Sequence, residues 1–113
     1  MDESFEILIR IRITKHDGDK SCAFGFGTAE LLRGVSEHGS LNRAAHEMGM
    51  AYSKAWKSLR ETEKQLGFSL LDRHGANGSV LTAKAVRFLS VYDKMTAHAT
   101  QAAKTLLDEL AVK

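Results

Sequence analysis

Several residue types and patterns are scarce or missing in this 113-residue sequence, and each absence excludes a class of protein. Cys22 is the only cysteine, so no internal disulfide can form, and a reducing, cytoplasmic location is expected. No apolar run approaches the ~18 residues that cross a bilayer. Residues 1–4 (MDES) are acidic where a secretory signal would be basic. With no proline, no repeat and no low-complexity tract, the sequence predicts a single domain over residues 1–113.

Patterns that support catalysis or metal binding are also missing. The histidines are scattered without the spacing of a metal site, and one cysteine cannot form a CxxC pair. Neither a nucleophile elbow nor a phosphate-binding loop occurs. The short run Gly25-Phe26-Gly27 is better explained as a flexible connection than as a nucleotide loop. We therefore predict that the protein is not an enzyme and that it needs no cofactor or metal ion.

Positive charge is concentrated in the middle of the chain, although the net charge of the whole sequence is only +2. Residues 1–39 contain five Lys/Arg and seven Asp/Glu, and residues 88–113 contain three of each. Residues 40–87 contain eight Lys/Arg and four Asp/Glu, a local charge of +4. A surface that binds anions requires such an excess, but an excess this small also arises by chance. Charge alone does not decide between the two explanations.

The first predicted elements are an N-terminal strand with a polar turn, over residues 1–20, and a helix. From Phe5 to Thr14 apolar residues alternate along the chain, and this period of two with many β-branched residues is typical of a strand. A helix is predicted over residues 28–38, with Thr28 as its N-cap. Gly39 occupies the place of the glycine that often ends a helix.

Two further helices, a hairpin and a long helix are predicted to follow. Ser40 would cap the second helix, which Gly49 closes, and the third helix would run from Tyr52 or Ser53 to Leu66. The later elements are strands at residues 68–73 and 80–81, a polar hairpin at 74–79, and a helix at 83–110 that Thr82 caps. Three helices followed by a hairpin form a winged helix-turn-helix, so we predict a mainly α fold of this class. Residues 28–82 would hold the helix-turn-helix and the wing.

The third predicted helix divides into an apolar face and a basic face. At about 100° per residue, its core side carries Ala55, Leu59, Thr62 and Leu66, and its opposite side carries Ser53, Lys57, Arg60 and Lys64. Lysines on an ordinary solvated face would give the same pattern. Because small residues (Ala44 and Ala45) and a turn glycine (Gly49) precede this helix, we favour a helix that projects into the major groove of DNA.

The predicted DNA-binding residues lie on the second and third helices and beside the hairpin. Residues in the first turns of the third helix would reach base edges, and later cations would reach phosphates. The set is Asn42, Arg43, Tyr52, Ser53, Lys54, Lys57, Ser58, Arg60, Lys64 and Arg73. The hairpin either contacts DNA or is an inert surface turn. Trp56 either stacks on nucleic acid or, as we favour, is buried between the helix and the wing.

Apolar residues in the last predicted helix recur with gaps of three and four, which is a heptad pattern. They are Ala85, Phe88, Tyr92, Met95, Ala99, Ala102 and Leu106. A helix of about 28 residues spans roughly 42 Å, which is longer than the core of so small a domain. We therefore predict a homodimer whose contacts are made by Tyr92, Met95, Ala99, Ala102 and Leu106. An alternative is a protein-interaction or dimerisation module that keeps the fold without binding DNA.

Four stretches resemble the N-terminal DNA-binding domain of ModE-type molybdate-responsive regulators. They are SLNRAA at residues 40–45, MAYSKAW at 50–56, LGFSLLDR at 66–73 and LT at 81–82. The chain is similar, more weakly, to LysR-type regulators, which usually lack the leading strand and the tryptophan. The resemblance implies a dimeric transcriptional regulator that places the helix from Ser53 in the major groove. Molybdate is not expected to bind, because the oxyanion-binding domain of the ModE-type regulators does not follow within residues 1–113.

Overall fold

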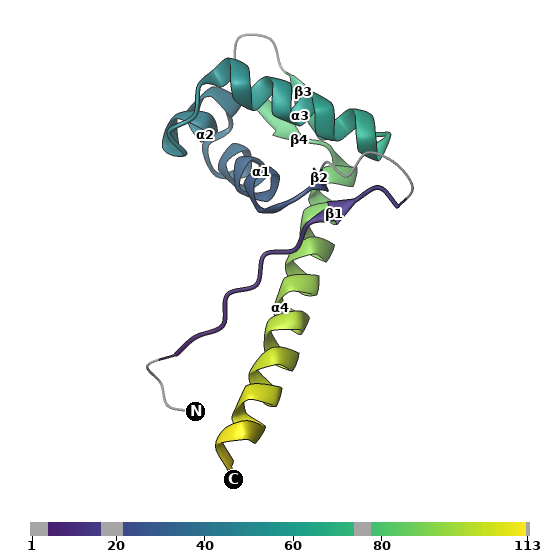
Figure 1. Cartoon of the computed structure of the whole chain (residues 1–113). Coiled ribbons are helices and arrows are strands. Elements are labelled where there is room, and N and C mark those ends of the chain that lie inside the picture. The colour runs from purple at the N-terminus through teal and green to yellow at the C-terminus, as the bar shows by residue number, and fades with distance from the viewer. Residues whose placement is uncertain (1–4, 17–21, 74–77, 113) are drawn as a thin grey trace.

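A computed structural model describes residues 5–16, 22–73 and 78–112 of the chain. The elements are β1 (Ile13–Thr14), β2 (Cys22–Phe24), α1 (Phe26–His38), α2 (Leu41–Glu47), α3 (Tyr52–Leu66), β3 (Leu71–Arg73), β4 (Ser79–Leu81) and α4 (Ala83–Val112). The helices α1, α2 and α3 form one body with the two pairs of strands, and α4 extends far beyond it (Figure 1). The mainly helical winged helix-turn-helix predicted from the sequence is confirmed.

The core lies where α1, α2 and α3 meet. Leu32 of α1, Ala45 of α2 and Leu59 of α3 are fully buried there. The crossing of α1 and α2 is very close, since a Cβ atom added at Gly34 would lie 2.6 Å from the Cβ of Ala44. The small residues expected at a helix crossing are therefore present, with Gly34 as a partner that the sequence did not reveal.

Most of the predicted helix ends are confirmed. The Ser40 hydroxyl accepts a hydrogen bond from the Arg43 N–H at 3.0 Å, and the Thr82 hydroxyl accepts one from the Ala85 N–H at 3.1 Å. Gly39 and Gly67 adopt the left-handed conformation just after α1 and α3. These caps satisfy backbone groups that a helix leaves open at its ends.

The prediction for the start of the first helix was wrong. The helix α1 begins at Phe26, with Gly25 as its N-cap, so Thr28 lies inside the helix. The Ala29 N–H already donates to the Gly25 carbonyl oxygen at 3.0 Å. The strand β2 comes directly before this turn and fixes where the helix starts, and the sequence analysis did not predict that strand.

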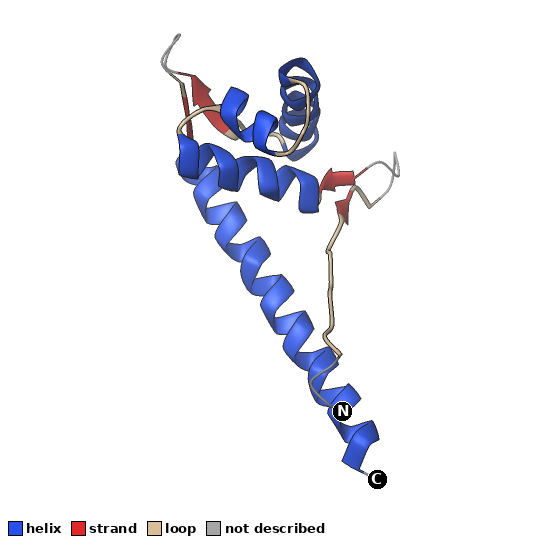
Figure 2. Cartoon of the chain, turned by 90° about the vertical axis from the view of Figure 1, so that its left-hand side faces the viewer, coloured by secondary structure: helices blue, strands red, loops and turns tan. Residues whose placement is uncertain are grey.

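The N-terminal strand is much shorter than predicted. Only Ile13 and Thr14 pair with β2, in an antiparallel arrangement, and residues 5–12 are extended without a neighbouring strand among the described residues. A strand requires a hydrogen-bonding partner as well as a suitable pattern. In both ribbon views residues 5–12 run toward the free end of α4 (Figures 1 and 2).

The two strands of the wing pair in register, with Leu71 opposite Leu81 and Arg73 opposite Ser79. The predicted strands at residues 68–73 and 80–81 are thus confirmed with shifted bounds, and residues 74–77 of the predicted hairpin lie outside the described residues. The Ser79 N–H donates to the Gly39 carbonyl oxygen at 3.0 Å. A Cβ atom at Gly78 would collide with that same oxygen, so the wing is seated directly on the turn between α1 and α2.

The first turns of α4 belong to the core. The Tyr92 ring lies 5.0 Å from the ring of Phe24, and its hydroxyl donates to the Ile11 carbonyl oxygen at 2.7 Å. Tyr92 is only 2% exposed, so its predicted role in dimer contacts is corrected: this side chain is used inside its own chain. A heptad pattern does not distinguish these two uses of an apolar residue. Within the described residues, no helix is both long and apolar enough to cross a membrane.

An ion pair also joins α1 to α4. The Arg33 guanidinium lies 2.7 Å from the Asp93 carboxylate and 2.9 Å from that of Glu30. Burial disfavours the charged form of Arg33, but the hydrogen bonds and negative charges of Asp93 and Glu30 outweigh it and raise the Arg33 pKa. The direction of α4 relative to the helical body is therefore fixed by both apolar and charged contacts.

Candidate nucleic-acid interface

The helix α3 has the two faces that its sequence predicts. Ala55 and Leu59 are fully buried, Thr62 is 4% exposed and Leu66 is partly buried against the same core. On the opposite face, the side chains of Ser53, Lys57, Arg60 and Lys64 are all exposed. The fold thus presents three cations and no acidic residue on the outer face of α3. We call this set of four residues the outer face.

Hydrogen bonds hold the chain just before α3 and at the end of the helix. At its start, the Met50 N–H donates to the Ala45 carbonyl oxygen at 2.9 Å, and Gly49 turns the chain with a φ of +68°. At its end, the Glu63 carboxylate accepts from the Leu70 N–H at 2.7 Å. The charge of Glu63 is thus directed at the loop that leads to β3, which leaves the outer face without that acidic neighbour.

The other predicted residues on α2 and α3 are also at the surface. Tyr52 is 37% exposed, and Lys54 and Ser58 are exposed beside it in the first turns of α3. Asn42 and Arg43 are exposed at the start of α2. The Arg43 guanidinium lies 3.8 Å from the Glu47 carboxylate, an exposed pair that is too weak to prevent other contacts.

Trp56 and Arg60 form a contact along α3. The Arg60 guanidinium carbon lies 5.2 Å from the centre of the Trp56 ring, within the range of a cation–π interaction. Trp56 is half-buried and packs against the core, so the ring is not a free surface platform for stacking on bases. The contact limits the directions that Arg60 can take.

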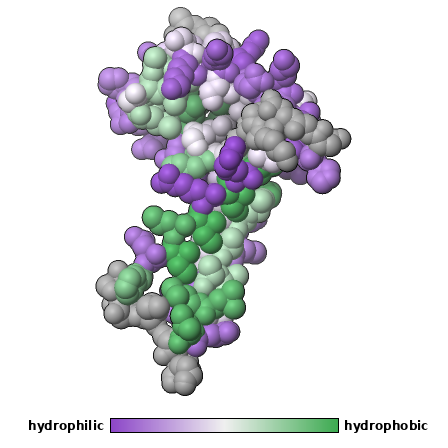
Figure 3. Space-filling model, viewed as in Figure 1, coloured by the Kyte–Doolittle hydropathy of each residue, from purple (hydrophilic) through white to green (hydrophobic). Residues whose placement is uncertain are grey.

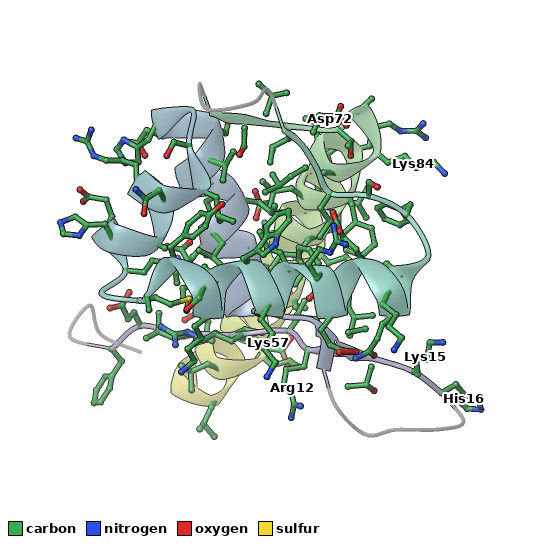
Figure 4. The ribbon with its side chains drawn as sticks, turned by 90° about the horizontal axis from the view of Figure 1, so that it is seen from above. Arg12, Lys15, His16, Lys57, Asp72 and Lys84 are labelled. Carbon is green, nitrogen blue, oxygen red and sulfur yellow. The ribbon has the colours of Figure 1, made fainter. Side chains whose placement is uncertain are left out.

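The described residues of the wing give less evidence about contact with DNA than those of α3. The side chain of Arg73 lies outside the described residues, as does the predicted hairpin at residues 74–77. Asp72 on β3 and Lys84 on α4 lie on the other side of the molecule from Lys57 (Figure 4). The contact of Arg73 with DNA therefore stays a prediction, and both alternatives for the hairpin, contact with DNA and an inert surface turn, stand.

Two arginines that the sequence analysis did not single out lie close to α3. Arg10 and Arg12 of the N-terminal segment line one cavity of about 710 Å³ together with Lys54 and Lys57. Figure 4 shows Arg12 and Lys57 pointing to the same side of the molecule. The alternating pattern places Arg10 and Arg12 on one side of the segment, opposite the isoleucines. This alternation is the feature of the sequence from which an exposed pair of arginines could have been predicted. The net charge over residues 1–39 concealed it.

Comparison with family models identifies the chain. The model described as "Bacterial regulatory helix-turn-helix protein, lysR family" matches residues 27–86, which is more than half of the sequence. These residues run from the first turn of α1 to the first turn of α4 and include the whole helix-turn-helix and wing. The chain therefore belongs to the LysR family of bacterial regulatory helix-turn-helix proteins.

Curated relatives confirm the resemblance to ModE. The chain is 28% identical over 86 residues to the "DNA-binding transcriptional dual regulator ModE" of Escherichia coli K12, a match that covers 73% of this chain and 33% of that protein. It is 35% identical over 83 residues to the transcriptional regulator ModE of Haemophilus influenzae, covering 70% of this chain and 32% of that protein. The chain thus matches about a third of the length of these relatives.

Solved structures confirm the fold. The DNA-binding domain of CbnR in a DNA complex has a TM-score of 0.59 at 22% identity, and the match covers 77% of this chain and 97% of that one. The DNA-binding domain of BenM with benA site 1 DNA has a TM-score of 0.57 at 20% identity, covering 75% of this chain and 93% of that one.

Proposed function

We propose that the protein is a transcriptional regulator that binds specific sequences of duplex DNA as a homodimer and is not an enzyme. The observation that carries the proposal is the outer face of α3, where three exposed cations project from a helix whose other side is fixed in the core. The family and the DNA-bound structures of similar fold support it. The proposal places the protein in the cytoplasm and includes no molybdate site in this chain.

The first turns of α3 would read the DNA sequence. A helix fits the major groove, and its N-terminal residues come closest to base edges. Ser53, Lys54, Lys57 and Ser58 are exposed hydrogen-bond donors in these turns. Arg60 and Lys64 lie further toward the C-terminal end of α3 and would contact phosphates, together with Asn42 and Arg43. Tyr52 and Arg73 complete the proposed set.

The distal part of α4 would form the dimer. The helix has 30 residues, which corresponds to about 45 Å, and only its first turns are covered by the core. Met95 is 40% exposed and Leu106 is 66% exposed, and Ala99 and Ala102 continue the same heptad pattern between them. Figure 3 shows hydrophobic side chains along the visible face of distal α4. A second copy of the same helix would bury this surface and present two copies of α3 to one duplex.

The test is selection of bound fragments from random duplex DNA, followed by titration of a selected duplex. Lys57→Glu replaces a cation of the outer face by an anion, and we expect it to abolish binding. Lys104→Glu is the matched control, because Lys104 is exposed on α4 and away from α3. Equal binding by the two variants would show that α3 is not part of the DNA interface. Recovery of no enriched sequence would favour a dimerisation module without DNA binding.

A further inference from the structure

We infer that Arg10 and Arg12 bind the phosphate backbone of the DNA next to α3, so that the N-terminal segment is part of the DNA interface. This inference rests on the proposed function. Its basis is the cavity of about 710 Å³ that opens between the N-terminal segment and α3. Arg10 and Arg12 line one side of the cavity, and Lys54, Lys57 and Ser58 line the other.

The charges around this cavity favour an anion. Four cations and one carboxylate, that of Glu61, line it, which gives a net charge of +3. In the part of the chain that the structure describes, none of the four cations is ion-paired to a carboxylate. Arg10 and Arg12 would each gain from a phosphate contact, because such a contact neutralises their charge and releases condensed counterions from the DNA.

The N-terminal segment is held in place at three points. The Arg10 guanidinium carbon lies 4.0 Å from the centre of the Phe26 ring, and the Tyr92 hydroxyl donates to the Ile11 carbonyl oxygen at 2.7 Å. Ile13 pairs with Phe24 in β1 and β2. Because these contacts already fix the backbone around Arg12, a phosphate contact there costs less ordering entropy than one made by a free chain end.

The geometry suits a backbone phosphate rather than a base. Ile11 and Ile13 are half-buried, and the alternation of a strand therefore turns Arg10 and Arg12 outward. Arg12 points to the same side as Lys57 (Figure 4). With α3 in the major groove, residues beside α3 face the phosphates at the groove edge, where an arginine can donate two parallel hydrogen bonds. Such contacts fix position and carry no sequence information.

The test compares two double variants of the full chain on a selected duplex and on unrelated duplexes. Arg10→Ala/Arg12→Ala removes the proposed contacts, and Lys94→Ala/Lys104→Ala removes two exposed cations of α4 as the matched control. We expect the first variant to weaken binding to all duplexes by similar factors. We also expect the slope of log affinity against log salt to flatten by roughly 1.8 per protomer, at about 0.9 for each phosphate contact. The control should keep the parent slope.

The outcomes separate this inference from the proposed function. A parent-like salt slope in Arg10→Ala/Arg12→Ala, with binding still lost in Lys57→Glu, would overturn the inference and leave the proposed function intact. Weakening that is confined to the selected duplex would overturn the assignment to phosphate. Salt-independent binding by the parent would overturn both. The single variant Arg12→Ala, which leaves the Arg10–Phe26 contact in place, controls for loss of structure, and a slope change of about half the size is expected.

Discussion

Two glycines in α1 are expected to respond in opposite ways to the same substitution. A Cβ atom at Gly34 would lie 2.6 Å from the Cβ and 3.1 Å from the Cα of Ala44, whereas a Cβ atom at Gly27 would meet nothing within 4 Å. Carbon atoms in contact are ordinarily about 3.5–4.0 Å apart. Because the backbone of Ala44 cannot rotate away, Gly34→Ala must push α1 and α2 apart by about 1 Å.

The sign of each change in the free energy of unfolding depends on the balance between helix propensity and overpacking. Alanine in place of glycine inside a helix stabilises it by about 1 kcal/mol. Overpacking a well-filled core costs about 1–3 kcal/mol, and this cost applies at Gly34 only. We therefore expect Gly34→Ala to lower the free energy of unfolding by up to about 2 kcal/mol, and Gly27→Ala to raise it by about 0.5–1 kcal/mol, since Gly27 lies in the first turn.

Urea denaturation followed by circular dichroism at the helical minimum measures both changes. The two variants serve as matched controls, because they carry the same substitution in the same helix. A Gly34→Ala variant as stable as Gly27→Ala would refute the close crossing of α1 and α2. The result bears on function, since that crossing sets the position of α2 and, through the turn at Gly49, the start of α3.

Two other predictions concern the N-terminal segment and the dimer. Tyr92→Phe removes the hydrogen bond to the Ile11 carbonyl oxygen and should lower the free energy of unfolding by about 1 kcal/mol. We expect faster hydrogen exchange at residues 11–14, and unchanged exchange would contradict this prediction. Leu106→Glu places a charge on the exposed apolar face of distal α4 and should convert the proposed dimer to a monomer in sedimentation analysis. Lys104→Glu is its control, and a Leu106→Glu protein that stays dimeric would exclude this face.

The sequence predicted the parts of the site that depend on local pattern. The third helix was expected from Tyr52 or Ser53 to Leu66 and is observed at Tyr52–Leu66. Its buried and exposed faces follow from periodicity alone, because apolar residues at helical spacing gather on one side of a helix and polar residues on the other. The caps at Ser40 and Thr82 were also predictable from the local sequence, because a cap involves residues only three positions apart.

The parts that depend on contacts between distant segments were not predictable. β2 forms because Phe24 packs against Phe88 and Tyr92, with ring centres 4.7 and 5.0 Å apart, and nothing local to residues 22–24 indicates those partners. Tyr92 was assigned to the dimer because the heptad pattern is continuous through both parts of α4. Only the fold shows which part of α4 is covered by the core and which part extends beyond it.

Arg10 and Arg12 illustrate a different limit. They alternate with isoleucines, so the sequence shows that they share one side of an extended segment, but it does not show what faces them. Their position beside Lys54 and Lys57 results from the pairing of β1 with β2 and from the contact between Ile11 and Tyr92. A charge total over the N-terminal third also includes acidic residues that the fold places elsewhere or that lie outside the described residues.

The salt dependence of duplex binding tests the outer face of α3 most directly. Arg60 and Lys64 of the outer face, together with Arg43 on α2, would make three phosphate contacts per protomer and six per proposed dimer, which corresponds to a slope of log affinity against log salt of about −5. We predict a slope at least as steep as about −3 between roughly 50 and 200 mM salt for the unmodified chain. A slope near zero would mean that the cations of the outer face do not meet DNA phosphates.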